Sequence, residues 1–143
     1  MLEILNQCAI DQISNGATAA ETAVTSSVLD MSGYDGVLFI ASLATVVDTS
    51  VLGLTAYENT ANSTSGGTAV TNGAATFTAS GSSNTLLVVD VIRPKNRYLY
   101  CTLTRTTANA TLNNIVAVRY RGHAAPVTQG ATVLAAVTST PEV

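Results

Sequence analysis

Short segments in which apolar and polar residues alternate make up most of this chain, and turn residues separate them. A period of two places every second side chain on the same face, which is typical of a half-buried β-strand. Segments that alternate in this way, or that are continuously apolar, are residues 22–29, 36–45, 51–57, 68–70, 75–79, 85–92, 97–105 and 110–121. None of the chain shows a convincing helical period. The pattern therefore predicts an all-β protein with about eight strands.

Two of these segments, residues 36–45 and 85–92, are apolar on both faces. Strands of this kind are expected in the middle of a sandwich, where both faces are covered. Asn72-Gly73 stands between residues 68–70 and 75–79 and is the strongest short hairpin signal in the chain. We therefore expect two short strands joined by a tight turn at this position.

Residues 97–105 and 110–121 are predicted to form the last hairpin, joined by a four-residue loop. If Arg105 pairs with Ala110, the two strands share one apolar and one amphipathic face. The apolar face then contains Leu99, Cys101, Leu103, Leu112, Val116 and Val118. The amphipathic face contains Tyr98, Tyr100, Thr102, Thr104, Thr111, Asn113, Ile115, Ala117 and Arg119. Such a face is suited to an interface, although a covered inner sheet has a similar composition.

The two ends of the chain lack a sustained pattern. Residues 1–20 are expected to form an N-terminal arm, and residues 124–143 a C-terminal arm with an apolar stretch at residues 133–137. Residues 21–123 then form one domain, which agrees with the length of the chain. The predicted fold is a jelly-roll-like β-sandwich of about eight antiparallel strands with irregular N- and C-terminal arms.

The composition favours a protein whose surface is covered by partners. Hydrophobic residues make up 47% of the 143 residues and charged residues only 10%, whereas about 25% of residues are charged in typical soluble domains. Few charges are then left to keep a free monomer in solution. A threonine-rich sandwich that exists alone at low concentration remains the alternative.

Cysteine usage and the apolar runs bear on the compartment. Cys8 and Cys101 are too few for a disulfide framework, and we interpret both as free thiols. No apolar run approaches the ~18 residues of a membrane span, and the first residues do not resemble a signal peptide. The expectation is a soluble protein that is synthesised in a cytoplasm and has no membrane partner.

The charges are divided along the sequence. All six Lys and Arg residues lie between Arg93 and Arg121, whereas the first 92 residues contain eight acids and no basic residue. This division suggests a complementary contact between copies of the chain. The residues predicted at the subunit interface are Arg97, Tyr98, Tyr100, Arg105, Arg119 and Arg121. The alternative is that the arginines pair with acids within one chain.

The sequence gives no set of catalytic groups, so we expect no enzyme. His123 is the single histidine, and neither His nor Cys residues stand at metal-ligand spacing. No phosphate-binding loop is present, and we expect no cofactor and no metal. The mixture of arginine and tyrosine after Arg93 also allows a nucleic-acid surface, but a net charge of −3 argues against that partner.

Four stretches carry a resemblance to a known family. They are Met31-Ser-Gly-Tyr-Asp-Gly-Val-Leu-Phe-Ile, Val47-Asp48-Thr49, Val89-Asp-Val-Ile-Arg-Pro-Lys-Asn-Arg-Tyr-Leu-Tyr-Cys and Arg105-Thr-Thr-Ala-Asn. In these stretches the chain resembles small virion proteins of tailed bacteriophages, some of which are similar to head decoration (cement) proteins. The resemblance covers about residues 23–126.

The resemblance implies a jelly-roll or related sandwich, often trimeric, on the outer surface of a phage capsid, where it bridges subunits of the major capsid protein. It implies a virion protein made in the cytoplasm of a bacterial host, and it transfers no binding residue. One alternative is another virion part, such as a head-fibre, neck or tail subunit. A second is a glycan-binding sandwich for host attachment, although the chain has no Trp and only five Tyr for aromatic platforms.

Overall fold

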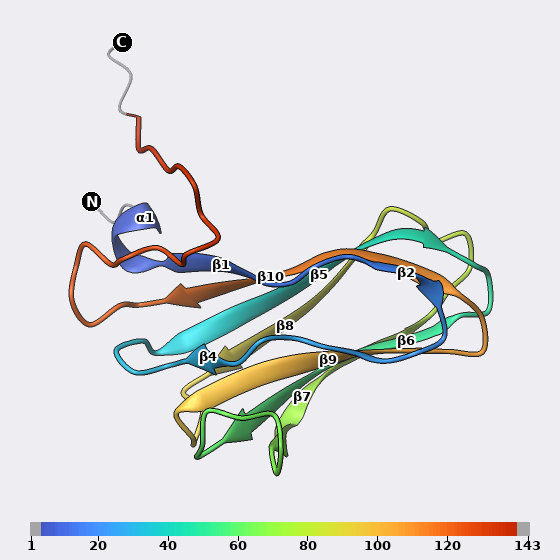
Figure 1. Cartoon of the computed structure of the whole chain (residues 1–143), viewed down its shortest axis with the longest axis horizontal. Helices are drawn as coiled ribbons and strands as arrows, with labels where there is room; N and C mark the ends of the chain where they lie inside the picture. The colour runs from blue at the N-terminus through green and yellow to red at the C-terminus, as the bar shows by residue number, and fades with distance from the viewer. Residues whose placement is uncertain (1–3, 140–143) are drawn as a thin grey trace.

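A computed structural model describes residues 4–139 of the chain, and nearly all regular structure in this range is β-strand. One short helix, α1 (Ile4–Gln7), precedes the strands. The strands are β1 (Ala9–Ser14), β2 (Ala17–Ala20), β3 (Val24–Thr25), β4 (Leu29–Asp30), β5 (Gly36–Val46), β6 (Val51–Asn59), β7 (Thr68–Thr78), β8 (Leu86–Ile92), β9 (Tyr98–Thr106) and β10 (Ala110–Tyr120). They form two antiparallel sheets that pack face to face (Figure 1).

The order of the strands defines the fold. Sheet A has the order β1-β10-β5-β8, with β2 beside β1 on the edge of β10, and sheet B has the order β3-β9-β6-β7, with β4 beside β3 on the edge of β9. We count β1 with β2 as one edge strand and β3 with β4 as another. The eight strands, numbered again along the chain, then have the orders 1-8-3-6 and 2-7-4-5 in the two sheets. This is the arrangement of a jelly roll. The fold class predicted from the sequence is confirmed.

The core lies between the sheets and follows from the alternation of each strand. On β5, Phe39 and Leu43 are buried on the inner face, whereas Leu38 and Ile40 are half-buried on the outer face. On sheet B, Leu54 and Leu103 are also fully buried. Facing inner residues of two sheets fill the space of about 10 Å between them.

The last predicted hairpin is wrong, because β9 and β10 belong to different sheets. β9 pairs with β6, and β10 pairs with β5. The predicted faces of β10 are also partly wrong, since the register against β5 shifts between Leu112 and Asn114. Extra residues at such a bulge reverse the phase of the strand. Ile115 and Ala117 are consequently buried in the core.

The hairpin predicted at Asn72-Gly73 is wrong as well. β7 continues from Thr68 to Thr78, and the turn residues lie inside it. Thr55 pairs with Ala74 but Tyr57 pairs with Ala69, so the residues between these partners form a bulge. Asn72 has a φ of 59°, a left-handed value that serves a bulge as well as a turn.

The predicted N-terminal arm, residues 1–20, is largely part of the sandwich. Its residues 9–20 form β1 and β2 on the edge of sheet A, where Ala9 and Ile13 are buried; residues 1–3 lie outside the described range. The first predicted strand, residues 22–29, is divided into β3 and β4. At this break the hydroxyl of Ser26 accepts the backbone N–H of Cys101 at 3.0 Å.

The C-terminal segment first follows the body of the protein and then leaves it. The backbone N–H groups of Gly122, Val127 and Gly130 donate to carbonyl oxygens of Gln7, Asn6 and Ile10. Beyond Val133 the described chain projects away from the sandwich on the side of β1 (Figure 1). The predicted C-terminal arm, residues 124–143, extends past the described residues.

Both cysteines are free thiols, as predicted. Cys101 is fully buried, and burial raises the pKa of its thiol to about 12. Cys8 is half-buried beside α1. None of the helical structure within residues 4–139 is long and apolar enough to cross a membrane.

Candidate interaction surfaces

The outer face of sheet A is apolar across its four strands. Cross-strand neighbours form continuous rows, one of which runs from Ile10 through Val118 and Leu38 to Asp90. We call the large aliphatic residues of this surface the apolar face: Ile10, Leu38, Ile40, Leu86, Val88, Ile92, Val116 and Val118. On β8, Leu86 is 60% exposed and Ile92 is 64% exposed. Single exposed apolar residues are ordinary, but a contiguous set marks a surface that binds a partner.

The outer face of sheet B has the opposite character. Its rows consist largely of threonine, and we call this surface the threonine face: Thr25, Thr55, Thr76, Thr78, Thr102, Thr104 and Thr106. The hydroxyls bond locally, for example that of Thr104 to the carbonyl oxygen of Gly53 at 3.2 Å. The sandwich therefore has one polar outer face and one apolar outer face.

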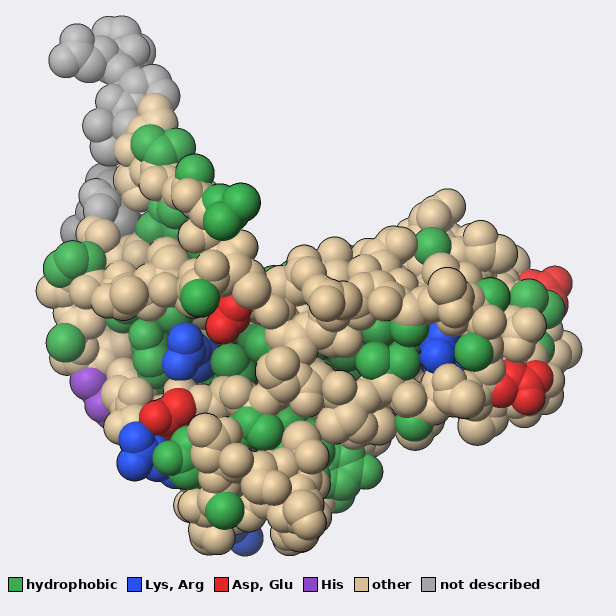
Figure 2. Space-filling model, in the orientation of Figure 1, with side chains coloured by type: hydrophobic (Ala, Val, Ile, Leu, Met, Phe, Trp, Pro, Cys, Tyr) green, Lys and Arg blue, Asp and Glu red, His purple; other side chains and the backbone are tan. Residues whose placement is uncertain are grey.

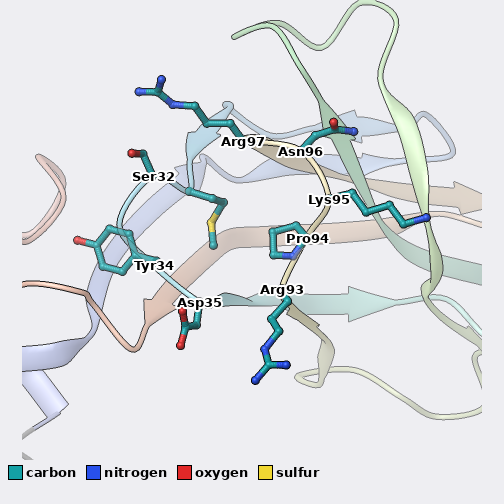
Figure 3. Close-up of a pocket in the computed structure, with 9 residues that line it drawn as sticks. Ser32, Tyr34, Asp35, Arg93, Pro94, Lys95, Asn96 and Arg97 are labelled. Carbon is teal, nitrogen blue, oxygen red and sulfur yellow. The ribbon is translucent and has the colours of Figure 1, made fainter.

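A basic segment follows β8 at one end of the sandwich. Arg93, Lys95 and Arg97 line an open hollow of about 380 Å³ beside the turn that precedes β5. The carboxylate of Glu58 fixes this segment by accepting the backbone N–H groups of Lys95 at 2.9 Å and of Asn96 at 3.2 Å. Figure 3 shows that the three basic side chains point in different directions. The hollow therefore does not gather positive charge around one bound anion.

Several charges at this end are paired within the chain. The carboxylate of Asp30 accepts two hydrogen bonds from Arg97, both at 2.8 Å. This guanidinium lowers the pKa of Asp30 below its ordinary value. Arg119 lies over the ring of Tyr34 at 4.8 Å and donates to the carbonyl oxygen of Asp30.

His123 and Asp90 have partners at the same end. The ring of His123 bonds to Asp35 at 2.9 Å, which lowers the pKa of that carboxyl. The hydroxyl of Tyr120 donates to Asp90 at 2.6 Å, and burial, followed by the bond to Asp90, raises the pKa of the phenol. Asp90 is exposed, and a tyrosine is its partner.

Arg105 lies between the sheets and is only 2% exposed. Its guanidinium donates to the carbonyl oxygens of Thr22 and Thr18, both at 2.8 Å, and of Ala110 at 2.7 Å. Burial lowers the pKa of this group. All its hydrogen-bonding partners belong to the same chain and are neutral.

The six residues predicted at the subunit interface therefore lie in different environments. Arg97 and Arg121 are exposed and Tyr98 is half-buried beneath Arg97, with 5.2 Å between the guanidinium carbon and the ring centre. Arg119 is half-buried against Tyr34. Tyr100 and Arg105 are buried at 5% and 2% exposure, so neither offers a free side chain to another subunit.

Tyr100 also does not form an exposed aromatic platform with Tyr98. Its ring stacks on Tyr57 with 5.2 Å between the ring centres, and its hydroxyl donates to the carbonyl oxygen of Thr64. The loop after β6 therefore covers it. Burial raises the pKa of this phenol.

Several exposed charges that form no ion pair lie at opposite ends of the sandwich. Arg93, Lys95 and Arg121 are exposed where β8 and β10 end. Glu21 and Asp48 are exposed near the opposite ends of the strands, since Ala20 and Val46 both pair with Ala110. The distance follows from the 11 residues of β5, which span roughly 35 Å. Figure 2 shows acidic side chains at one end of the molecule, whereas basic side chains, the histidine and further acidic side chains lie together toward the other.

Sequence reasoning missed the apolar face as a surface. Residues 36–45 and 85–92 were expected to be buried on both sides; β5 is indeed central, but β8 is an edge strand. The signal was present in the two-sided apolar pattern. Within residues 4–139, the structure contains no group of three or more His, Cys, Asp or Glu residues that is placed to hold a metal ion.

Comparisons with known proteins give little guidance. No family model matches the chain, and no curated protein matches it. Among solved structures, the chain is similar to one described as "Bacillus endospore appendages form a novel family of disulfide-linked pili". The two are 21% identical, the match covers 81% of this chain and 89% of that chain, and the TM-score is 0.49.

The burial of Arg105 leads to a prediction about stability. Replacing it in the variant Arg105→Met removes the donors to the carbonyl oxygens of Thr18, Thr22 and the buried Ala110, and hydrogen bonds to charged groups contribute about 1.5–3 kcal/mol each. We expect the free energy of unfolding to fall by about 3 kcal/mol in chemical denaturation. Arg97→Met is the matched control and should change stability much less, because its ion pair is exposed. Equal losses in the two variants would contradict this role of Arg105.

A second prediction concerns the pKa of Asp30. In Arg97→Gln, this pKa should rise toward its ordinary value, whereas Asp35, whose partner is His123, should keep its lowered pKa. Because the folded-state pKa of Asp30 is lowered, the ion pair stabilises the protein above the ordinary carboxyl pKa of about 3.9, and the contribution is lost as the pH falls. Carboxyl-detected NMR titration measures both groups. An unchanged Asp30 would contradict the assignment.

Proposed function

We propose that the chain is a structural subunit of a virus particle, and specifically a decoration protein on the outside of the assembled head of a tailed bacteriophage. The observation that carries this proposal is the contrast between the apolar face of sheet A and the threonine face of sheet B. A sandwich with one apolar outer face has one side suited to being covered by a protein partner. The resemblance of residues 23–126 to phage virion proteins suggests the major capsid protein as that partner.

Decoration stabilises a shell by linkage. A protein that binds only the assembled lattice adds its binding free energy to that state. A subunit that bridges neighbouring capsid proteins opposes their separation. This role requires no catalysis and no cofactor, and we assign none. The apolar face would equally suit a head-fibre, neck or tail subunit that binds another virion protein. Imaging the protein on the virion distinguishes these locations.

The charge distribution supports self-association as a homotrimer. The basic end with Arg93, Lys95 and Arg121 complements the acidic end with Glu21 and Asp48 in a head-to-tail contact. Such a contact closes into a ring when the rotation between subunits permits. Arg93 and Arg121 have φ values of 52° and 51°, where glycine avoids a cost of about 1–2 kcal/mol. The presence of arginine at two positions that suit glycine favours a role for the charge.

Replacing Arg93 and Arg121 by glycine tests this contact, because the substitution is expected to affect stability and trimer formation in opposite directions. In the double variant Arg93→Gly/Arg121→Gly, we expect equal or higher stability, because glycine suits the left-handed backbone, but weaker trimers at low salt. Chemical denaturation and sedimentation velocity measure the two quantities. Thr107→Gly relieves a similar φ of 72° without removing a charge, and should leave association unchanged. Trimers that persist in the double variant would count against the charged contact.

Binding to capsids tests the function itself. Val118→Lys places a charge at the centre of the apolar face, and Thr104→Lys places the same charge on the threonine face. Incubation with expanded phage heads that lack this protein, followed by co-sedimentation and electron microscopy, measures occupancy. We expect Val118→Lys to bind at least about tenfold more weakly, since burial of a valine is worth about 1.5–3 kcal/mol, and Thr104→Lys to bind like the unmodified chain. Equal binding by both variants would refute the proposed face.

A further inference from the structure

The four outer edges of the sandwich differ in how their unpaired backbone groups are protected. Exposed strand edges pair with other chains unless they are short, bulged, charged or covered. On sheet B, one edge consists of the two-residue strands β3 and β4, and the other, β7, is interrupted by its bulge. On the first edge of sheet A, β2 has only four residues. The neighbouring strand β1 is covered by the C-terminal segment: Ile10 bonds to Gln129 and Gly130, and the N–H of Gln12 donates to Thr132.

The fourth edge, β8, is open over seven residues, and its pairing with β5 has no register shift. Among the described strands it pairs only with β5. The bonds from Leu43 N–H to Thr85 and from Arg93 N–H to Asp35 show that odd-numbered residues of this segment direct their backbone groups toward β5. Because hydrogen-bonded pairs alternate along an antiparallel ladder, the even-numbered residues direct theirs toward the free edge. These residues are Leu86, Val88, Asp90 and Ile92.

The side chains along this edge do not block pairing. Three of the four outward residues are aliphatic, and the carboxylate of Asp90 is already bonded to Tyr120. Beside the edge, a cavity of about 450 Å³ opens between the sheets. It is lined by Leu43, Leu52, Phe77, Leu86 and Leu87 among others, and Phe77 is 47% exposed there. A strand added to β8 would cover Phe77 and close this cavity.

The described end of the chain has the complementary properties. Residues 134–139 are all exposed and uncharged, with Leu134 at 97% and Val137 at 83% exposure. The last hydrogen bonds that tie this segment to the body join Thr132 to Gln12 and Asp11, and the bond from the N–H of Val133 to Gly130 lies within the segment. Figure 2 shows hydrophobic side chains on the projecting segment. An exposed apolar strand-length segment and an open apolar edge are therefore both present in one chain.

Residues 134–139 cannot pair with the free edge of β8 in their own subunit. The segment is anchored at β1, which lies on the opposite edge of sheet A from β8. Three strand spacings of about 4.8 Å separate the two edges, and crossing them takes about four residues at roughly 3.5 Å each. The crossing would use Leu134 and Val137 before pairing begins. A second copy of the chain does not have this restriction.

We propose that residues 133–139 of one copy add as a strand to the free edge of β8 in another copy. Strand addition of this kind gains main-chain hydrogen bonds, and alternate side chains of the donor enter the adjoining pocket. The donor leaves one edge of sheet A and the acceptor is the other edge, so the contact is head to tail. This contact uses other residues than the charged contact proposed for the trimer, it goes beyond the proposed binding to capsids, and it is measured without them.

The test uses the full chain and a variant with substitutions in the projecting segment only. Leu134→Asp/Val137→Asp charges both faces of the donor strand; Thr76→Asp/Thr104→Asp carries the same added charge on the threonine face. In sedimentation velocity over a concentration series, we expect the first variant to self-associate at least about tenfold more weakly than the unmodified chain, and the second to match it.

Hydrogen exchange identifies the edge residue by residue. In the unmodified chain, the amides of Leu86, Val88 and Ile92 should become protected as concentration rises, whereas Val89 and Val91 are protected at every concentration. The variant with two aspartates in the tail should lose only the concentration-dependent protection. Protection that survives in that variant means that another segment occupies the edge, and association without protection of the even-numbered amides means that another surface is used. Either result, or a chain that stays monomeric throughout, overturns the proposal.

Discussion

The buried guanidinium of Arg105 is the interaction that holds two of the crossings between the sheets together. The chain changes sheet several times, and these two crossings lie between β2 and β3 and between β9 and β10. Thr22 lies in the first of these crossings, and Arg105 and Ala110 flank the second. A backbone that leaves a sheet loses its ladder partners, and buried carbonyl oxygens must find other donors. One planar group with several fixed donors satisfies both crossings, which a lysine does not match.

This interaction was visible in the sequence only in retrospect. Arg105 continues the inward phase of Leu99, Cys101 and Leu103, so strict alternation places it in the core. The division of charges along the sequence instead predicted a place for it at a subunit interface. Backbone carbonyl oxygens compensate for the burial of the charge, and no sequence pattern records them. Sequence patterns also do not record which strands pair over long range, and the pairing of β9 with β6 and of β10 with β5 places these two strands in different sheets.

Local turn chemistry was a weaker guide than strand periodicity. The strands from β5 onward start and end close to their predicted limits, because an alternating pattern reports which residues face the core. Asn72-Gly73 indicates only that the backbone can adopt a left-handed conformation here, and in β7 this conformation occurs at a bulge. The bulge in β10 likewise exchanged Val116 and Val118 for Ile115 and Ala117 in the core. Neither outcome is decided by neighbouring residues alone.

The hydrophobic pattern of a strand predicts which side chains are buried, but it does not predict which part of the molecule or which partner covers them. β8 has the pattern of a central strand but lies at an edge, so the cover that its pattern demands must come from outside the subunit. The same segment that closes the β1 edge with Gln129 and Thr132 carries Leu134 away from the body. Because the β1 edge is covered and the β8 edge is open, sheet A can accept an added strand at the β8 edge but not beside β1. A sheet with two open edges would pair without limit in either sense, whereas one open edge and one tethered donor permit growth only from tail to edge.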